Sequence, residues 1–290
     1  VATGVLAEVT DVNFTGSSAL VYLDGYFFIA VPNSLTLKHS AQQDGTSWPS
    51  ANTASADSLH DNVIGLAANN RQLYVFGSKS TEVWFNNTNP SGFVLSRRDD
   101  TYIDRGCCNA KTIQTLNNLV IWMDDNRYIV SMTTDKPETI STEPINAYLM
   151  GLNSIEDAYS STFITGGHWF YALTLPSEDL TFIYDFTTKM WFKWMYWNQG
   201  TAQHEHHLFS AIAKFKQRCL VFDRQSPKMY LLDETSYTDN SQPIVRVDIT
   251  QPLYDEFNWI SVGRLEIKVE TGVGLATGQG SDPQIMLSYS

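Results

Sequence analysis

The chain lacks long hydrophobic runs and has few cysteines. No apolar stretch reaches the length of a membrane-spanning helix, because Asp24 and Gly25 interrupt the best candidate. No basic-then-apolar leader opens the sequence, so we expect neither a signal peptide nor membrane insertion. Three cysteines, Cys107, Cys108 and Cys219, are too few to build a disulfide framework in 290 residues. The sequence therefore predicts reduced thiols in a cytoplasm.

Basic residues are too few to balance the acidic ones. The chain has 19 Lys and Arg against 31 Asp and Glu, which gives a net charge of −12. Binding to DNA phosphates depends on clustered positive charge and on the release of counterions. This composition excludes a DNA-coating protein and predicts no sequence-specific nucleic-acid recognition. Such a protein can still face DNA without adhering to it.

Helical periodicity and the common catalytic motifs are also missing. The sequence has no phosphate-cradling glycine loop, no HExxH and no GxSxG. Aromatic residues make up 13% of the chain, which favours β structure because aromatic side chains pack well on a pleated sheet. We therefore predict an all-β protein, and no motif in the sequence calls for a cofactor.

Short alternating apolar segments, joined in pairs by tight polar turns, fill the chain instead. The five clearest hairpins read ALVYLDGYFFIAV, IGLAANNRQLYVFG, KTIQTLNNLVIWM, STFITGGHWFYALTL and FSAIAKFKQRCLVF. Gly or Asn occupies most of the turns, where a positive φ is needed. The turn positions, Gly25, Asn70, Asn118, Gly167 and Lys216, recur every 45 to 49 residues.

Further strands follow these hairpins. TEVWFN, RYIVSM, TFIYDF and KMYLLD supply a third strand, and FVLSRR, ETIST and MWFKWMYW a fourth. Four strands in each unit of 45–50 residues are typical of a β-propeller blade. We predict a single propeller domain over residues 1–290, with six blades favoured and five to seven possible. PIVRVDIT, RLEIKVE and PQIMLSYS would build the sixth blade, with GVLAEVT near the N-terminus closing the ring.

The stretch 187–197 is unusually aromatic. Trp191, Trp194 and Trp197 stand close to Phe192, Tyr196 and two methionines. Between Trp191 and Trp197 both alternating faces of a strand would be apolar, whereas a sugar-binding platform or a solvated sheet would show polar alternation. We therefore predict one strand buried between two neighbouring blades.

One cluster has the residue types of a metal site. His204, Glu205 and His206 are consecutive, and His204 and His206 would share one side of an extended chain. Zinc ligands are usually better separated in sequence. A polar loop explains the same residues, and we favour it. We therefore predict no metal site.

Two further stretches resemble motifs of known propellers. HSAQQDGTSW (39–48) resembles the Asp-box of sialidase-type propellers, but its Gly45 follows Asp44 directly, so the spacing differs by one residue. No feature identifies the carboxylate pair that a glycosidase needs. GGHWFYALTL followed by TFIYDFTTKMW resembles a kelch unit, although the glycine doublet occurs in one of the five units. Arg97 to Asp100 we interpret as a solvated loop whose charges cancel.

An ordered set of segments resembles the packaged-DNA stabilisation proteins of short-tailed bacteriophages, which are hub or nozzle components of the tail. The resemblance covers residues 20–34, 44–48, 61–86, 105–123, 170–191, 237–240, 263–274 and 282–290. No single segment is specific to this family, but the order of the segments along the chain is. In such proteins the last motif continues into an Asp-Gly-rich turn and a Trp, and the first residues here resemble an internal position. We therefore expect this chain to be a fragment of a longer one.

The resemblance implies a late, non-enzymatic virion structural protein. Members dock below the portal and adaptor, six around the axis, and contact other tail proteins. They extend the DNA channel, help retain the packaged genome and take part in virion assembly and DNA ejection. The implied location is the tail of the virion, after assembly in the host cytoplasm. No catalytic or binding residue is implied, because the functional surface is an assembly interface. A kelch-like module that binds protein or carbohydrate, and a sialidase-like glycosidase, are the alternatives.

Overall fold

The computed structural model describes residues 8–87, 92–101, 103–133, 136–216, 218–223, 226–236, 238–249, 258–268 and 287. The chain divides into two compact units, which are Val1–Trp194 with His206–Leu232, and Met195–Glu205 with Asp233–Ser290. Within the described residues the fold is all-β apart from one α-helix and two short 3-10 helices, as predicted. That helix, α1 (Glu143–Gly151), is too short to cross a membrane, and no helix in the described part of the chain is long and apolar enough to do so.

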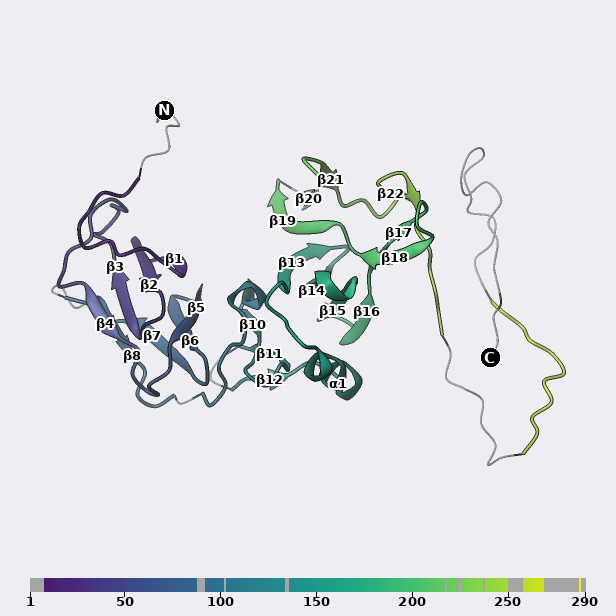
Figure 1. Ribbon diagram of the computed structural model, residues 1–290, viewed down its shortest axis with the longest axis horizontal. Helices are drawn as coiled ribbons and strands as arrows, with labels where there is room; N and C mark the ends of the chain where they lie inside the picture. The colour runs from purple at the N-terminus through teal and green to yellow at the C-terminus, as the bar shows by residue number, and fades with distance from the viewer. Residues whose placement is uncertain are drawn as a thin grey trace. The chain divides into compact units, whose positions relative to one another are not determined.

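Five antiparallel sheets follow one another along the first unit, coloured from purple to green in Figure 1. We call them the first to fifth blades. The first blade comprises β1 (Ala19–Leu23), β2 (Tyr26–Ala30), β3 (Thr36–His39) and β4 (Thr53–Ser55). The second comprises β5 (Val63–Asn69), β6 (Gln72–Gly77), β7 (Thr81–Asn86) and β8 (Leu95–Arg97). The third comprises β9 (Gln114–Leu116), β10 (Leu119–Met123), β11 (Ile129–Met132) and β12 (Glu138–Thr139), with the 3-10 helix η1 (Ala110–Thr112) before it.

The fourth and fifth blades come after α1. The fourth comprises β13 (Tyr159–Thr165), β14 (His168–Leu175), β15 (Leu180–Asp185) and β16 (Met190–Lys193), with the 3-10 helix η2 (Pro176–Glu178) between β14 and β15. The fifth has three strands, β19 (Phe209–Phe215), β20 (Arg218–Asp223) and β21 (Met229–Leu231). Two small sheets complete the described strands: β17 (Met195–Asn198) with β18 (Gln203–His206), and β22 (Thr238–Asp239) with β23 (Gln242–Pro243).

All five predicted hairpins are confirmed, and local backbone chemistry explains them. Each begins its blade as the antiparallel pair β1–β2, β5–β6, β9–β10, β13–β14 or β19–β20. Every one of these turns contains at least one residue with φ between 48° and 91°; these include Gly25, Asn70, Asn117, Gly167 and Lys216. Glycine and asparagine adopt that conformation more readily than other residues, so the turns are encoded locally.

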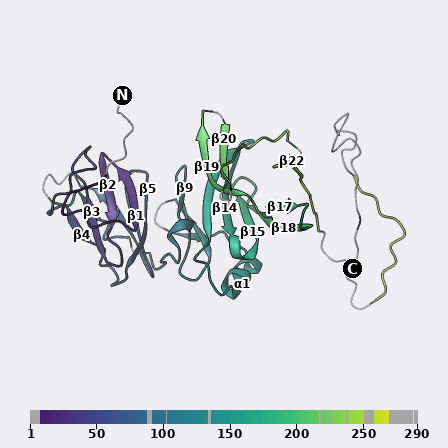
Figure 2. The same ribbon diagram turned by 45° about the horizontal axis from the view of Figure 1, so that its top comes forward.

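The sheets pack in the manner of propeller blades. The first strand of each blade contacts the first strand of the next, in the order β1, β5, β9, β13 and β19. In a propeller these are the innermost strands, and the sheets stack face to face around them. Figure 2 shows the fifth blade (β19 and β20) next to the fourth, and β13 contacts β19 directly, as expected for adjacent blades.

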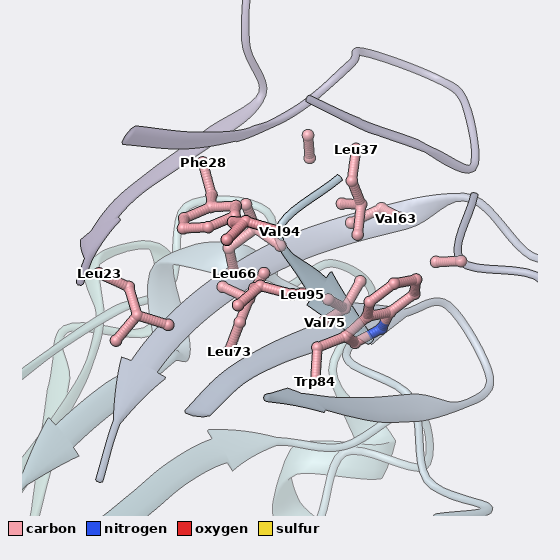
Figure 3. Close-up of a cluster of buried hydrophobic side chains, with 12 residues drawn as sticks. Leu23, Phe28, Leu37, Val63, Leu66, Leu73, Val75, Trp84, Val94 and Leu95 are labelled. Atoms are coloured by element: carbon pink, nitrogen blue, oxygen red, sulfur yellow. The ribbon is translucent and has the colours of Figure 1, made fainter. Parts of the chain in front are cut away.

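An apolar core fills the space between the first two blades. Figure 3 shows Leu23, Phe28 and Leu37 from the first blade facing Leu73 and Trp84 from the second. Phe28, Leu37 and Leu73 are completely buried. A second core joins the second and third blades, and a third joins the fourth and fifth. Each blade therefore depends on its neighbour to bury its apolar face.

The aromatic stretch departs from the prediction of one strand buried on both faces. The strand is interrupted at Trp194, so β16 belongs to the fourth blade and β17 to the second unit. Because β16 is the outermost strand of its blade, Met190 and Phe192 remain 52% and 40% exposed. Trp191 packs on Tyr184, with ring centroids 4.9 Å apart, and donates to the Ile140 carbonyl. The prediction was wrong because burial depends on a second neighbour, which an outer strand lacks.

The strands predicted for a sixth blade have no counterpart among the described residues. Residues 244–249 and 258–268 carry no helix or strand. The predicted strand at 4–10 and the last predicted strand at 283–290 lie largely outside the described residues. The structure therefore contains four four-stranded blades and a three-stranded fifth one in its described part.

Candidate assembly surfaces

Each blade is an antiparallel sheet in chain order, so the loops that connect its strands lie at two opposite ends of the sheet. In an antiparallel sheet that runs in chain order, the first and third connections lie at one end, and the second connection and the exit to the next sheet lie at the other. We call the first end the turn face, which includes the five hairpin turns. We call the second end the loop face, which includes 78–80, 124–128 and the segments between blades.

Contacts between neighbouring blades confirm that the loop face is continuous. Lys79 Nζ lies 3.1 Å from the carboxylate of Asp125, and Arg105 Nη1 lies 3.2 Å from that of Asp124. Arg97 Nη1 lies 2.8 Å from the carboxylate of Asp57, in the connection after the first blade. Burial raises the pKa of Asp124, although backbone hydrogen bonds and Arg105 act in the opposite direction. These pairs join the first, second and third blades at one end.

Negative charge is concentrated on the loop face. Its acidic residues are Asp57, Asp61, Asp99, Asp100, Asp104, Asp124, Asp125, Glu143, Glu156, Asp157, Glu178 and Asp179. Its basic residues, among those described up to η2, are Lys79, Arg97, Arg98, Arg105, Lys111 and Arg127. On the turn face, Asp24, Asp44 and Asp185 are balanced by Arg71, Lys136, Lys189 and Lys216. The two ends of the blades therefore differ in charge.

Residues 97–100 were predicted to form a solvated loop, but Arg97 forms ion pairs with residues outside this stretch. Arg97 ends β8 and also lies 3.7 Å from the carboxylate of Glu82, whose side chain is 5% exposed. Arg98 lies 3.4 Å from Asp100, so the charges pair locally as predicted.

The outer side of the fifth blade is an apolar sheet face without a neighbouring blade. One side of this sheet packs through Ile212, Val221 and Tyr230 against the fourth blade. The other side presents Ala211, Ala213, Phe215, Leu220, Phe222, Met229 and Leu231, which we call the open face. Phe215 and Met229 are 59% and 58% exposed. Part of the open face forms a groove of about 870 Å³, and its lining, which includes two basic residues, comprises Phe215, Lys216, Arg218, Leu220, Met229, Tyr230 and Leu231.

Strand register shows that the open face corresponds to a surface covered in the earlier blades. The matching cross-strand pairs of the five first hairpins are Val21 with Phe28, Ala67 with Tyr74, Gln114 with Ile121, Phe163 with Phe170, and Ala213 with Leu220. The first, second and fourth pairs belong to the apolar cores shared with the next blade. In the third pair, Gln114 Nε2 donates to the Ser160 carbonyl of the fourth blade. The fifth pair lies on the open face.

The first blade shows the complementary feature at the other end of the series. The side of β1 that faces away from the second blade carries Leu20 and Tyr22, which are 57% and 55% exposed. Part of this side is covered, because Phe14 packs on Trp48 and Lys38 Nζ donates to the Asn13 carbonyl. Both terminal blades therefore expose apolar side chains where an interior blade would be covered.

The three metal candidates interact with other groups. His206 Nδ1 lies 3.0 Å from the Asp179 carboxylate, and Glu205 accepts a hydrogen bond from Asn198 Nδ2 at 2.7 Å. The His204 ring packs edge-on against Trp197, and its Nδ1 is buried without a hydrogen-bond partner. No three His, Cys, Asp or Glu side chains come together as a metal site in the part of the chain that the structure describes.

The Asp-box-like stretch forms a tight turn that anchors a tryptophan. Asp44 Oδ1 accepts hydrogen bonds from the backbone nitrogen and the hydroxyl of Thr46, at 2.9 and 2.6 Å. Trp48 is 2% exposed and donates from Nε1 to the Gly45 carbonyl at 3.0 Å. These bonds tie the turn to the core of the first blade, which is a structural arrangement.

The kelch-like segment also has a structural geometry. Gly166 and Gly167 form the hairpin turn of the fourth blade, with φ of 55° and 81°. Asp185 accepts hydrogen bonds from His168, at 2.7 Å, and from Thr187 and Thr188, both at 2.8 Å. Burial would raise the pKa of Asp185, but these bonds outweigh it and hold the pKa at about 2.

Cys107, Cys108 and Cys219 are free thiols in the structure. Burial raises the pKa of the Cys107 thiol to about 12 and also raises that of Cys108. Both thiols therefore stay protonated and unreactive at neutral pH.

Sequence reasoning did not find the open face or the charge difference between the two ends. The apolar alternation of β19 and β20 predicts strands but not which side lacks a neighbour. The charge difference was accessible in principle, because strand order assigns every connection to one end.

Solved structures similar to this chain are low in sequence identity. BamB from Moraxella catarrhalis is 10% identical, with a TM-score of 0.46 over 77% of this chain and 60% of its own. Myxococcus xanthus glutaminyl cyclase is 12% identical, with a TM-score of 0.36 over 76% and 93%. YCF48 from Cyanidioschyzon merolae is 11% identical, with a TM-score of 0.41 over 79% and 67%. This chain thus spans about 60% of the length of the BamB chain. Likenesses this weak support no argument about function.

Among curated protein sequences, none matches the chain. The protein family described as the β-propeller of bacteriophage P22 Gp10, a phage stabilisation family, matches residues 2–237. The match includes all five blades and agrees with the stacked antiparallel sheets. The chain therefore belongs to the phage stabilisation family of the bacteriophage P22 Gp10 β-propeller.

Proposed function

We propose that the chain is a non-enzymatic structural subunit of a phage tail. It docks below the portal and adaptor, contacts other tail proteins, extends the DNA channel and helps to retain the packaged genome. Membership of the phage stabilisation family over residues 2–237 is the observation that supports this proposal. The subunit is a single β-propeller domain of six blades, and the subunits form a ring of six in the virion after assembly in the host cytoplasm.

The distribution of charge supports a role beside DNA. Around a ring axis, repeated copies of a subunit with a net charge of −12 produce a negative lumen. A negative wall repels the phosphate backbone, so DNA can slide past it during ejection. The loop face is the acidic end of the blades, and we propose that it is the end directed toward the channel. A lumen rich in Lys and Arg would contradict this arrangement.

Light scattering tests the proposal most directly. The full-length gene product is measured alone and after mixing with a portal–adaptor complex. The expected result is a stoichiometric shift to an assembly that contains six added subunits. A monomer that does not bind the complex would contradict the tail role. A glycan array on the same sample provides a second readout, because a tail subunit of this kind binds no sugar specifically.

A further inference from the structure

We infer that the outward side of α1 is a docking surface for a protein segment that carries apolar side chains among lysines and arginines. We call this surface the α1 patch, and it comprises Pro144, Ala147, Tyr148, Met150 and Gly151. The inference rests on the proposed function, in which the loop face borders the channel and the partner is the portal–adaptor complex. It adds which surface of the subunit makes the contact and what chemistry the partner presents there.

The helix α1 is held in one orientation at the end of the fourth blade. Figures 1 and 2 both show it outside the strands, at the end of the sheet that contains β15. Arg127, in the turn between β10 and β11, donates from Nη1 to the carbonyls of Leu149, at 3.0 Å, and Leu152, at 2.6 Å. Tyr148 packs edge-on against Phe182 of β15, with ring centroids 5.9 Å apart. A surface fixed in this way loses little conformational freedom when a partner binds.

The α1 patch carries no charge, which is unusual for the exposed side of a helix. The buried residues of α1 lie on the opposite side; they are Ile145, Asn146 and Leu149. The exposed side of a surface helix normally carries charged residues. Glu143, at the first position, is the one charged residue among the nine of α1. Tyr148 and Met150 are 37% and 49% exposed, and both residue types are enriched where proteins bind one another.

The stability of the fold does not account for α1. Nine residues are too few for a stable helix in water without tertiary contacts. Thr142 makes no side-chain capping bond, and the buried Asn146 Oδ1 has no hydrogen-bond partner. A connection between blades can also be much shorter, since residues 56–62 join the first blade to the second. The fold therefore does not require α1, and elements that depart from ideal local structure are often functional.

Acidic side chains lie next to the α1 patch. The Tyr148 hydroxyl donates to Glu178 Oε2 of η2, at 3.4 Å. Asp157 Oδ2 accepts hydrogen bonds from the backbone nitrogen and the hydroxyl of Ser177, at 2.8 and 2.7 Å, so it holds η2 in place. Asp179 follows η2 directly, and its side chain is 60% exposed. Together with Glu143 and Glu156, these residues give the patch an acidic rim.

Nearby cations do not neutralise this rim. Lys193 Nζ lies 5.9 Å from the centroid of the Phe182 ring, and His206 Nδ1 lies 3.0 Å from the Asp179 carboxylate. Arg127 is the third cation, and its Nη1 is used by the carbonyls at the end of α1. An uncharged centre inside an acidic rim is complementary to apolar side chains flanked by lysines and arginines. The same rim repels nucleic-acid phosphates, so the partner is a protein.

Light scattering with three variants of the full-length gene product tests the inference. Met150→Lys places a positive charge in the α1 patch, and Met150→Glu places a negative charge at the same position. Met190→Lys, at a residue of similar exposure on β16, is the matched control. We expect Met150→Lys to lower the affinity for the portal–adaptor complex at least about tenfold, as at a central interface residue. Met150→Glu should lower it less, and Met190→Lys should leave it unchanged.

The outcomes separate this inference from the proposed function. If the unsubstituted protein binds the complex and Met150→Lys binds equally well, the inference is wrong and the tail role stands. A larger loss with Met150→Glu than with Met150→Lys would contradict a basic partner. If the unsubstituted protein does not bind the complex, both the tail role and the inference are wrong. Self-association that Met150→Lys abolishes, with binding to the complex retained, would overturn the inference in favour of a second copy.

Photo-crosslinking identifies the partner segment directly. p-Benzoylphenylalanine replaces Tyr148 in the α1 patch, and in a control it replaces Phe192, which is exposed on β16. Both proteins are irradiated in the presence of the portal–adaptor complex, and the linked peptides are sequenced by mass spectrometry. We expect crosslinks from position 148 to a peptide with lysine or arginine beside apolar residues, and none from position 192. Crosslinks to a peptide without basic residues, or equal crosslinks from both positions, would overturn the inference.

Discussion

At the scale of single residues, a few buried polar groups connect the blades. Glu82 is the clearest example, because its side chain is 5% exposed and its carboxylate serves several donors. It accepts hydrogen bonds from Trp84 Nε1 at 2.8 Å and from the Ser58 backbone nitrogen at 2.7 Å. Ser58 lies in the connection between the first and second blades. Glu82 therefore ties this connection to the second blade.

Replacing this carboxylate should be costly. Glu82→Ala leaves the buried Trp84 Nε1 and the partly buried Ser58 nitrogen without their acceptor, and we expect the free energy of unfolding to fall by about 2–4 kcal/mol. Urea denaturation followed by tryptophan fluorescence measures the change. Glu156→Ala, at an exposed loop position, provides the control and should change the free energy by less than about 0.5 kcal/mol. Equal losses for the two variants would contradict the assigned role of Glu82.

At the scale of elements, the connections between blades pack closely against neighbouring turns. Gly106 lies in the connection after the second blade, and its carbonyl accepts a hydrogen bond from Trp122 Nε1 at 3.0 Å. A Cβ atom at this position would lie 2.3 Å from Lys79 N and from Ser78 C. Backbone atoms cannot move aside as a flexible side chain can. The contact therefore requires glycine.

Two glycine-to-alanine variants separate this effect from a general change in chain entropy. Gly106→Ala should lower the free energy of unfolding by about 2 kcal/mol or more, because the turn or the connection must shift. Gly151→Ala, at the end of α1, meets no atom within 4 Å and should be neutral or slightly stabilising. Thermal unfolding of both variants tests the difference. A stable Gly106→Ala protein would show that the connection is not held against residues 78–79.

Element identity was largely predictable, whereas burial was not. The five hairpins were found because alternation and turn residues are properties of adjacent positions. The stretch 187–197 was assigned to one buried strand because both of its sides are apolar. The structure divides it at Trp194 and leaves Phe192 exposed, because the edge of a blade is defined by strands that are distant in sequence.

At the scale of the whole molecule, the buried His39 and the partly buried His207 couple stability to pH. Burial lowers the pKa of His39 from its ordinary value of 6.5, despite hydrogen bonds to the carbonyls of Ser40 and Gly92. Burial and the neighbouring His206 lower the pKa of His207 to about 4. As the pH falls below 6.5, these two histidines therefore bind protons in the unfolded chain before they do so in the folded chain. The histidine contribution is complete above pH 6.5 and is lost as the pH falls toward 4.

This linkage predicts a loss of stability before the carboxylates titrate. Between pH 7.5 and pH 4.5 we expect the free energy of unfolding to fall by roughly 2 kcal/mol. Urea denaturation at several pH values measures how steeply the free energy of unfolding changes with pH. His39→Gln should reduce the slope, and His60→Gln, at an exposed position, should leave it unchanged. A flat profile for the unsubstituted protein would contradict the neutral state of both histidines in the folded chain.

The amino-acid order alone accounts for the five hairpins, the interval between them, the excess of negative charge and the resemblance to the phage stabilisation family. These are local or compositional properties, since turn chemistry and alternation act between neighbouring residues. Which sheet faces are covered depends instead on how the blades pack in three dimensions. Ala213 and Leu220 have the same register and the same alternation as Phe163 and Phe170, yet only the second pair has a blade packed on it. Burial depends on what lies opposite in space, and no property of the strand itself records that.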